Sequence, residues 1–230
     1  MDEFFVGYLP VPAGVRRFVR RAVALAIALA AVVAVVLVLT QARFPASRFD
    51  FGEYRDYQGA LSLLPYPALS GGWLVVAPGK HGAAGLPAGY VKLKGALIRN
   101  GDDRMLELLP GSVQPAAGAA APSTETDLGP VEWTGEIVDS KCYFGVMNPG
   151  RGKVHRDCAA RCIAGGIPPA LLVRDAAGLA RTVLVAGSDR RPLSAEVRDF
   201  IAEPVRVRGR LVRFGGRLLL LAEPRDFRRE

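Results

Sequence analysis

All three cysteines of this 230-residue chain lie in one short stretch of its C-terminal half, together with one of its two histidines. Thiolates and imidazole are ligands of Zn²⁺, and sulfur also suits Cu(I). If a short helix begins near His155, then His155, Cys158 and Cys162 lie on one helical face, and Cys142 reaches that face from the preceding strand or loop. The sequence therefore predicts a metal centre for zinc or copper made of Cys142, His155, Cys158 and Cys162.

Two further residues can add a ligand to this centre. Met147 follows Cys142 closely and carries a soft thioether, which favours Cu(I). His81 lies in a glycine-containing loop, beside Lys80, and either side chain can contact an anion or join the site from the first half of the chain. A solvent-exposed loop histidine is the simpler interpretation of His81.

Two interpretations without a metal stay open. An odd number of cysteines leaves one thiol unpaired, so Cys142 can form a disulfide with Cys158 or Cys162 and fasten this segment to the rest of the domain. Alternatively the spare thiol is reactive, because nearby basic residues, Lys141 among them, favour the thiolate. Neither a C-x-x-C redox pair nor a C-x-x-C-H haem motif is present.

A hydrophobic stretch near the N-terminus places this cluster relative to a membrane. Residues 22–39 are 18 consecutive Ala, Val, Leu and Ile residues, enough for a membrane-spanning helix when extended to residue 42. The stretch is longer than the apolar part of a cleaved signal peptide, which favours a retained anchor over residues 1–42. Four arginines precede it (Arg16, Arg17, Arg20 and Arg21), so we expect a cytoplasmic N-terminus and a periplasmic body on a bacterial inner membrane.

The rest of the chain contains two related β-rich halves. Residues 91–101 and 205–215 both alternate apolar and basic residues around a central glycine, Gly95 or Gly209, and then return in an apolar strand. This pattern is similar to the five-stranded oligonucleotide/oligosaccharide-binding (OB) barrel. We therefore expect a mainly β protein, in which an N-terminal transmembrane helix is followed by two small OB-like β-barrels, over residues 43–113 and 131–230.

The expected barrels differ in one respect. The second half holds about 38 residues more between equivalent glycines than the first, and this partly helical insertion, residues 139–169, contains every cysteine. Residues 114–130 are rich in Ala, Pro, Gly, Ser and Thr and predict a linker between the barrels. The sequence thus predicts a Cys/His-containing insertion in the second barrel only.

Composition and missing motifs exclude several classes of protein. Nucleophile-elbow, phosphate-loop and dinucleotide-binding motifs are absent from the sequence. Residues 131–230 hold 18 basic and 12 acidic residues, which suits a membrane surface or an acidic protein partner, while no stripe of aromatic and basic residues predicts a nucleic-acid partner.

The cysteine segment also resembles a known group of bacterial proteins. The run CYFGVMNPG from Cys142, followed by HRDCAARC and GGIPP, resembles a signature of little-characterised bacterial exported proteins that are anchored in the membrane. This implies that the segment is one functional unit. The layout is also similar to that of periplasmic haem chaperones of cytochrome c maturation, but their haem-binding His and Tyr are missing from the tail, residues 225–230.

These observations predict a membrane-anchored, extracytoplasmic accessory protein without enzymatic activity. It would bind a metal or cofactor through its Cys3His cluster and serve a membrane redox or assembly complex, with another membrane or periplasmic protein as its partner. The alternatives are a thiol oxidoreductase acting on exported proteins, and a disulfide-stapled structural or interaction module without a metal.

Overall fold

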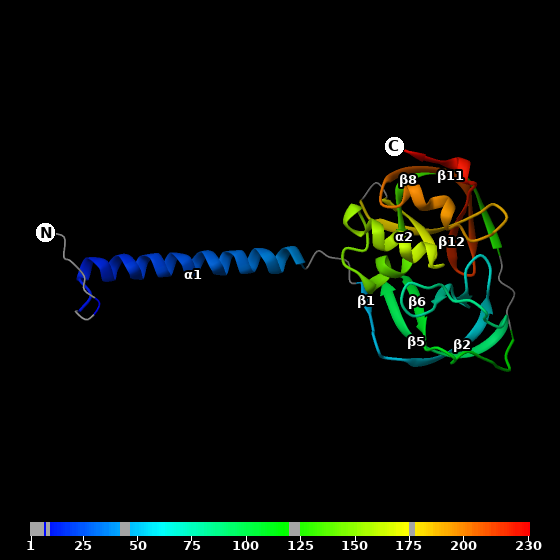
Figure 1. Ribbon diagram of the computed structural model, residues 1–230, viewed down its shortest axis with the longest axis horizontal. Helices are drawn as coiled ribbons and strands as arrows, with labels where there is room; N and C mark the ends of the chain where they lie inside the picture. Colours follow the sequence, from blue (N-terminus) through cyan, green and yellow to red (C-terminus); the bar gives the residue numbers. More distant parts are fainter. Residues whose placement is uncertain (1–6, 8–9, 42–46, 120–124, 175–177) are drawn as a thin grey trace. The chain divides into compact units, whose positions relative to one another are not determined.

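The first element is a long helix that is apolar on all sides. The computed structural model describes residues 7, 10–41, 47–119, 125–174 and 178–230 (Figure 1). Helix α1 (Ala13–Gln41) has 29 residues, about 44 Å at 1.5 Å per residue. Its apolar side chains are exposed around the whole helix. None of this apolar stretch is buried among the described residues, and α1 has the length and composition of a membrane anchor or a signal sequence.

The first barrel is a closed sheet of five strands. Antiparallel pairing runs in the order β5-β2-β3-β4, β4 pairs in parallel with β6, and β6 closes the barrel onto β5. Two short strands, β1 and β7, add to β5. The strands are β1 (Arg48–Phe49), β2 (Arg55–Ser62), β3 (Ala68–Leu69), β4 (Trp73–Val76), β5 (Gly89–Asn100), β6 (Asp103–Leu108) and β7 (Gln114–Pro115).

The second barrel repeats this topology. Its order is β8-β9-β10-β12-β11, with β10 parallel to β12, β11 closing the barrel onto β8, and β13 added to β11. The strands are β8 (Glu125–Asp139), β9 (Pro169–Arg174), β10 (Ala180–Ala186), β11 (Pro204–Phe214), β12 (Arg217–Leu221) and β13 (Phe227–Arg229), with 3₁₀ turns η3 (Ala195–Phe200) and η4 (Pro224–Asp226). The predicted pair of OB-like barrels is confirmed.

The two barrels also share their register. Gly59 of β2 lies opposite Val91, and Gly135 of β8 lies opposite Val205, the equivalent residue of the second barrel. Gly95 is the residue at which β5 changes partner from β2 to β6. A Cβ at its counterpart Gly209 would lie 2.4 Å from the Leu221 carbonyl oxygen. Both glycines therefore allow the close strand approach that closes a small barrel.

An insertion between the first two strands distinguishes the second barrel. It comprises a π-helical turn η1 (Cys142–Val146), a 3₁₀ turn η2 (Lys153–His155) and helix α2 (Arg156–Ala164). The equivalent connection in the first barrel, residues 63–67, is a short loop. The cysteine-containing insertion is thus confirmed, and it occupies the loop between strands one and two of an OB-like barrel.

The linker expected over residues 114–130 is shorter in the structure. Residues 114–115 form β7, and β8 already begins at Glu125; residues 120–124 lie outside the described part. The first residues of β8 are polar, so their sequence does not predict a strand. They form one because β11 stabilises them by backbone pairing and by ion pairs such as Arg210–Asp127. Residues 46–230 form one compact unit rather than two separate barrels.

A shared apolar core joins the barrels. Leu74, Ile98 and Met105 of the first barrel cluster with side chains of the second, including Val138 and Leu219. Four buried residues of the insertion belong to the same cluster: Cys142, Phe144, Cys162 and Ile167. Each barrel has a further core of its own. The insertion therefore fills the junction between the barrels.

Polar contacts cross this junction as well. The guanidinium of Arg217 donates to Asp103 Oδ1 at 2.9 Å, to the carbonyls of Arg104 and Gly72, and stacks on the Phe144 ring. The buried Tyr66 hydroxyl donates to the Val185 carbonyl at 2.7 Å and accepts from the Leu193 amide at 3.2 Å. These bonds satisfy polar groups that the junction removes from water.

The Tyr66 contacts yield a prediction of stability. In Tyr66→Phe, the Val185 carbonyl and the Leu193 amide lose a partner inside the protein, so the free energy of unfolding should fall by about 1–3 kcal/mol. Urea unfolding of the full chain in detergent measures this, with Tyr54→Phe as the control because Tyr54 is 37% exposed. Equal stability of the two variants would show that the hydroxyl bonds do not hold the barrels together.

Candidate metal centre

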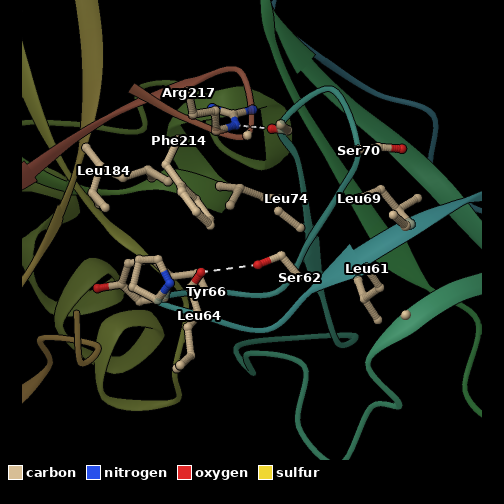
Figure 2. A pocket seen from close by; sticks show the side chains of 17 residues that line it. Leu61, Ser62, Leu64, Tyr66, Leu69, Ser70, Leu74, Leu184, Phe214 and Arg217 are labelled. Atoms are coloured by element: carbon tan, nitrogen blue, oxygen red, sulfur yellow. Dashed lines mark hydrogen bonds between the residues drawn. The ribbon is translucent and has the colours of Figure 1, made fainter. Parts of the chain in front are cut away.

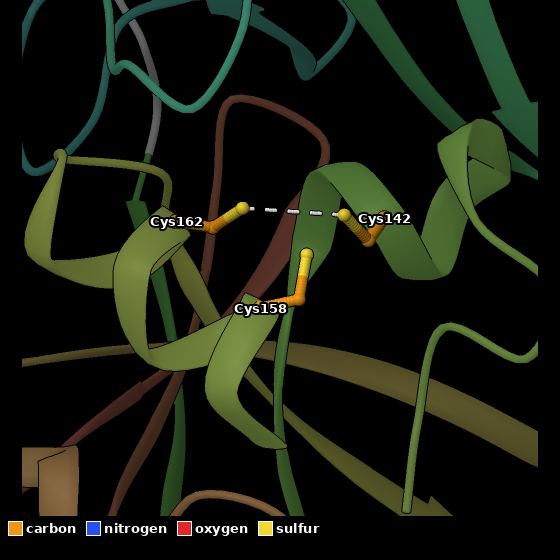
Figure 3. Close-up of side chains that lie close together, drawn as sticks. All are labelled: Cys142, Cys158 and Cys162. Atoms are coloured by element: carbon orange, nitrogen blue, oxygen red, sulfur yellow. Dashed lines mark hydrogen bonds between the residues drawn. The ribbon is translucent and has the colours of Figure 1, made fainter. Parts of the chain in front are cut away.

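The three cysteines converge at the junction. Cys142 is the first residue of η1, and Cys158 and Cys162 are one turn apart on α2, so they share a helical face. Their Sγ atoms all lie within 4.8 Å of one another, and the sulfurs of Cys142 and Cys162 are 4.0 Å apart (Figure 3). Cys142 and Cys162 are buried, while Cys158 is half-buried. The predicted convergence of the sulfurs is therefore present.

Asp139 positions the residues around Cys142. Its Oδ1 accepts the backbone N–H of Cys142 at 2.8 Å, and its Oδ2 lies 2.8 Å from His155 Nε2. Asp139 is fully buried and His155 is 3% exposed. Asp139 is not among the site residues predicted from the sequence, although an aspartate three residues before a helical turn is a known capping signal. Asp139 thus joins the end of β8 to the start of α2.

The predicted Cys3His set divides into two groups. The first is Cys142, Cys158 and Cys162; the second is Asp139, Cys142 and His155. Either group could hold a metal ion, and Cys142 belongs to both. His155 precedes the first residue of α2, and its ring is hydrogen-bonded to Asp139 rather than grouped with the sulfurs of Cys158 and Cys162. The imidazole therefore lies beside the sulfur cluster.

Lys80 contributes to the site from the other barrel. Its ammonium group lies 2.8 Å from Cys158 Sγ and 3.7 Å from Cys162 Sγ. The expectation that Lys80 can reach the site from the first half of the chain is thus met. His81, its neighbour, is exposed, and Met147 is 46% exposed at the end of η1. The Met147 amide donates to the Cys142 carbonyl at 3.2 Å, which is a backbone contact and not one through its sulfur, and His81 is not grouped with the cysteine sulfurs.

Glycines let the Lys80 loop approach α2. The amide of Gly82 donates to the carbonyl of Gly165 at 2.9 Å. A Cβ at Gly165 would lie 1.9 Å from the Lys80 carbonyl oxygen, and a Cβ at Gly82 would lie 2.2 Å from the Gly166 carbonyl oxygen. The Gly165-Gly166 pair, which the sequence indicates as a helix stop, therefore also provides the surface on which the loop rests.

Lys141 binds the backbone of the same loop. Its side chain is 2% exposed, and its Nζ contacts Glu107 Oε2 at 2.5 Å, the Ala77 carbonyl at 2.9 Å and the Gly79 carbonyl at 2.6 Å. From the sequence, Lys141 is expected among the basic residues that favour a thiolate. Instead its ammonium is engaged by the first barrel, where these partners compensate its burial.

The site favours one thiolate over the others. The hydrogen bond from the Cys142 thiol, helped by the Lys80 ammonium, lowers the pKa of Cys162 to about 7 against the opposing effect of burial. The same bond, burial and the Asp139 carboxylate raise the pKa of Cys142. Hydrogen bonding to Cys158 raises the pKa of Lys80, which keeps its positive charge. Cys162 is thus more readily a thiolate than Cys142 at neutral pH.

The expected disulfide is not formed. All three cysteines are free thiols, and the 4.0 Å between the sulfurs of Cys142 and Cys162 is about twice the length of a disulfide bond. Cys158 and Cys162 lie on one helix, where bridging requires backbone distortion. The three sulfurs are therefore available together as soft metal ligands.

A pocket lies at the junction of the barrels, and no cysteine lines it. Its volume is about 290 Å³ (Figure 2), and both barrels line it, with Leu61 and Tyr66 from one and Leu184 and Phe214 from the other. Arg217 borders it, but Asp103 and two carbonyls engage its guanidinium. This pocket is mainly apolar and brings no set of metal ligands together.

The state of the thiols can be titrated. In the reduced, metal-free protein, the ultraviolet absorbance of thiolate should rise near pH 7, with the thiol neutral below and ionised above that pH. Cys142→Ala should move this step to higher pH, because it removes the hydrogen bond that stabilises the Cys162 thiolate. His81→Ala is the matched control and should leave it in place. A titration without any thiolate below pH 8.5 would contradict this description of the cluster.

Comparison with protein-family models, with curated proteins and with solved structures finds no match for this chain. The chemistry of the site is therefore inferred from its own atoms: three free sulfurs, a buried Asp139–His155 pair and one lysine from the opposite barrel.

Proposed function

We propose that this chain is a membrane-anchored, extracytoplasmic protein that binds a metal ion through Cys142, Cys158 and Cys162. The observation that carries the proposal is the convergence of three free sulfurs, from two separate elements, within 4.8 Å of one another. Sulfur ligands favour soft ions, so zinc and copper are the candidates. Asp139 and His155 support the site by holding the backbone of Cys142.

The role is binding rather than catalysis. Cys142 and Cys162 are 3% and 1% exposed, so a macromolecular substrate does not reach them without rearrangement. The cluster instead suits storage or transfer of an ion as an accessory to a membrane redox or assembly complex. The excess of basic residues in the second half suits an acidic surface on a membrane or periplasmic partner.

A thiol oxidoreductase is the second candidate. The lowered pKa of Cys162 and its 4.0 Å separation from Cys142 favour thiol exchange. Only Cys158 of the three cysteines is partly accessible, however, and Cys142 and Cys162 are buried. A structural module stapled by a disulfide is the third, and it would require the free thiols to oxidise.

Helix α1 is the proposed anchor. Its length and uniformly apolar surface match a bilayer-spanning segment, and four arginines at its start favour an N-terminus in the cytoplasm. The barrels then lie outside the cytoplasm, on the periplasmic side of a bacterial inner membrane. Placing the sulfur cluster there exposes it to the metals and oxidants of that compartment.

Metal content tests the proposal. The full chain, purified reduced and without oxygen, should retain one equivalent of metal, and Cys142→Ser, Cys158→Ser or Cys162→Ser should each lose most of it because a thiolate ligand is removed. His81→Ala and Met147→Leu are the controls and should keep full occupancy. Elemental analysis together with a thiol count on the same sample measures both.

Two other outcomes would decide against metal binding. A mass two daltons lower before reduction than after it, with no bound metal, would support a disulfide. A mixed disulfide trapped with an exported protein through a single cysteine would support thiol exchange. Metal-free protein with three free thiols would contradict metal binding, and the same result from protein purified without reductant would also contradict the disulfide module.

The anchor can be tested by accessibility. With the orientation proposed, protease added to spheroplasts should digest the barrels, while a tag before residue 13 stays protected and remains attached to the membrane after carbonate washing. Protein without residues 1–41, directed to the periplasm by an unrelated cleaved signal, should be soluble there. Release of the full-length barrels from the membrane would show that α1 is a cleaved signal sequence instead.

A further inference from the structure

The donor set of the sulfur cluster restricts the number of ligands. Among the described residues, the group that contains all three sulfurs includes no histidine, aspartate or glutamate. The nearest such groups, Asp139 and His155, are hydrogen-bonded to each other, and the other oxygen of Asp139 accepts an amide. An ion among the sulfurs therefore meets three ligands, whereas structural zinc sites have four.

The spacing of the sulfurs agrees with three-fold coordination. In a flat triangle with metal–sulfur bonds of about 2.3 Å, neighbouring sulfurs lie about 4.0 Å apart. The sulfurs of Cys142 and Cys162 are separated by 4.0 Å. The cluster can accept an ion with only small side-chain movements.

Lys80 closes the open side of the cluster. Its ammonium lies within contact distance of two of the sulfurs, and an ammonium has no lone pair with which to bind a metal. It lies 2.8 Å from Cys158, the half-buried sulfur at which water can reach the cluster. Its charge also offsets part of the negative charge of three thiolates, as does the N-terminus of α2, where Cys158 lies in the first turn.

The remaining surroundings are apolar. Cys142 and Cys162 belong to the junction core with Leu74, Phe144 and Ile167. Cu(I) is soft, is stable with three thiolates, and is protected from oxidation where water and oxygen are excluded. Zn²⁺ would need a fourth ligand, and Asp139 and His155, the acidic and histidine side chains grouped with Cys142, are already hydrogen-bonded to each other.

Resting on the proposed function that these thiols bind a metal, we propose that the ion is Cu(I), held by Cys142, Cys158 and Cys162 alone, with Lys80 of the opposite barrel as the charged cap that keeps a fourth ligand away. Binding replaces the thiol protons, which pass to solvent, and leaves the oxidation state of copper unchanged. Cys158, the only half-buried sulfur, is the one at which an incoming ligand can exchange the ion.

Coordination number is the decisive measurement. The full chain in detergent, reduced and under argon, is loaded with Cu(I) or with Zn²⁺, and X-ray absorption counts the ligands. We expect one Cu(I) with three sulfurs and no nitrogen, which bicinchoninate removes only in large excess. Cu(I) with a fourth ligand, or Zn²⁺ that Cu(I) does not displace, would overturn this inference and leave the proposed metal function intact. Retention of neither ion would overturn both.

Variants test the part played by Lys80. Lys80→Met should raise the dissociation constant for Cu(I) about tenfold, because one charge-assisted hydrogen bond is lost. It should also allow a fourth, light-atom ligand to bind the ion, which the X-ray absorption spectrum would show. Lys92→Met, an exposed lysine of β5 in the same barrel, is the matched control and should match the unaltered protein. If the two variants bind Cu(I) equally well with three ligands, Lys80 is not the cap.

Discussion

A buried lysine joins the two barrels beside the sulfur cluster. The ammonium of Lys141 is inaccessible to water and depends on Glu107 and on the carbonyls of Ala77 and Gly79. Removing one partner of such a buried pair leaves an uncompensated charge, which is strongly destabilising. Because Lys141 directly precedes Cys142, and the loop it holds carries Lys80, the contact positions a sulfur and its cationic neighbour together. The site therefore depends on both barrels being folded.

The duplication explains why this junction exists. Both barrels have the same strand order and the same glycine register, yet only the second has a helical insertion between its first two strands. In an isolated barrel, the apolar face of that insertion would be exposed. Packing it against Leu74, Ile98 and Met105 of the first barrel buries this face. The first barrel thus supplies the wall of a site whose sulfurs all belong to the second.

Part of this arrangement can be predicted from the sequence, since local patterns encode it. The repeated glycines indicated two barrels, and the spacing of Cys158 and Cys162 placed both on one face of a helix. The direction of His155 could not be predicted in the same way. It depends on whether the helix begins one residue earlier or later and on Asp139, a partner at the end of another element. The path of Lys141 into the first barrel and the early start of β8 likewise depend on tertiary contacts.

The location of the cluster also links metal binding to the stability of the junction. One sulfur begins η1 at the end of β8, two lie on α2, and the neighbouring ammonium belongs to the loop after β4. An ion that binds only this arrangement stabilises it by the free energy of binding. Because a preformed cluster of three thiolates and one lysine requires these three segments in place, the proposed metal binding would be thermodynamically coupled to the packing of the two barrels. Release of the ion at the half-buried Cys158 would therefore loosen the same contacts that assemble the site.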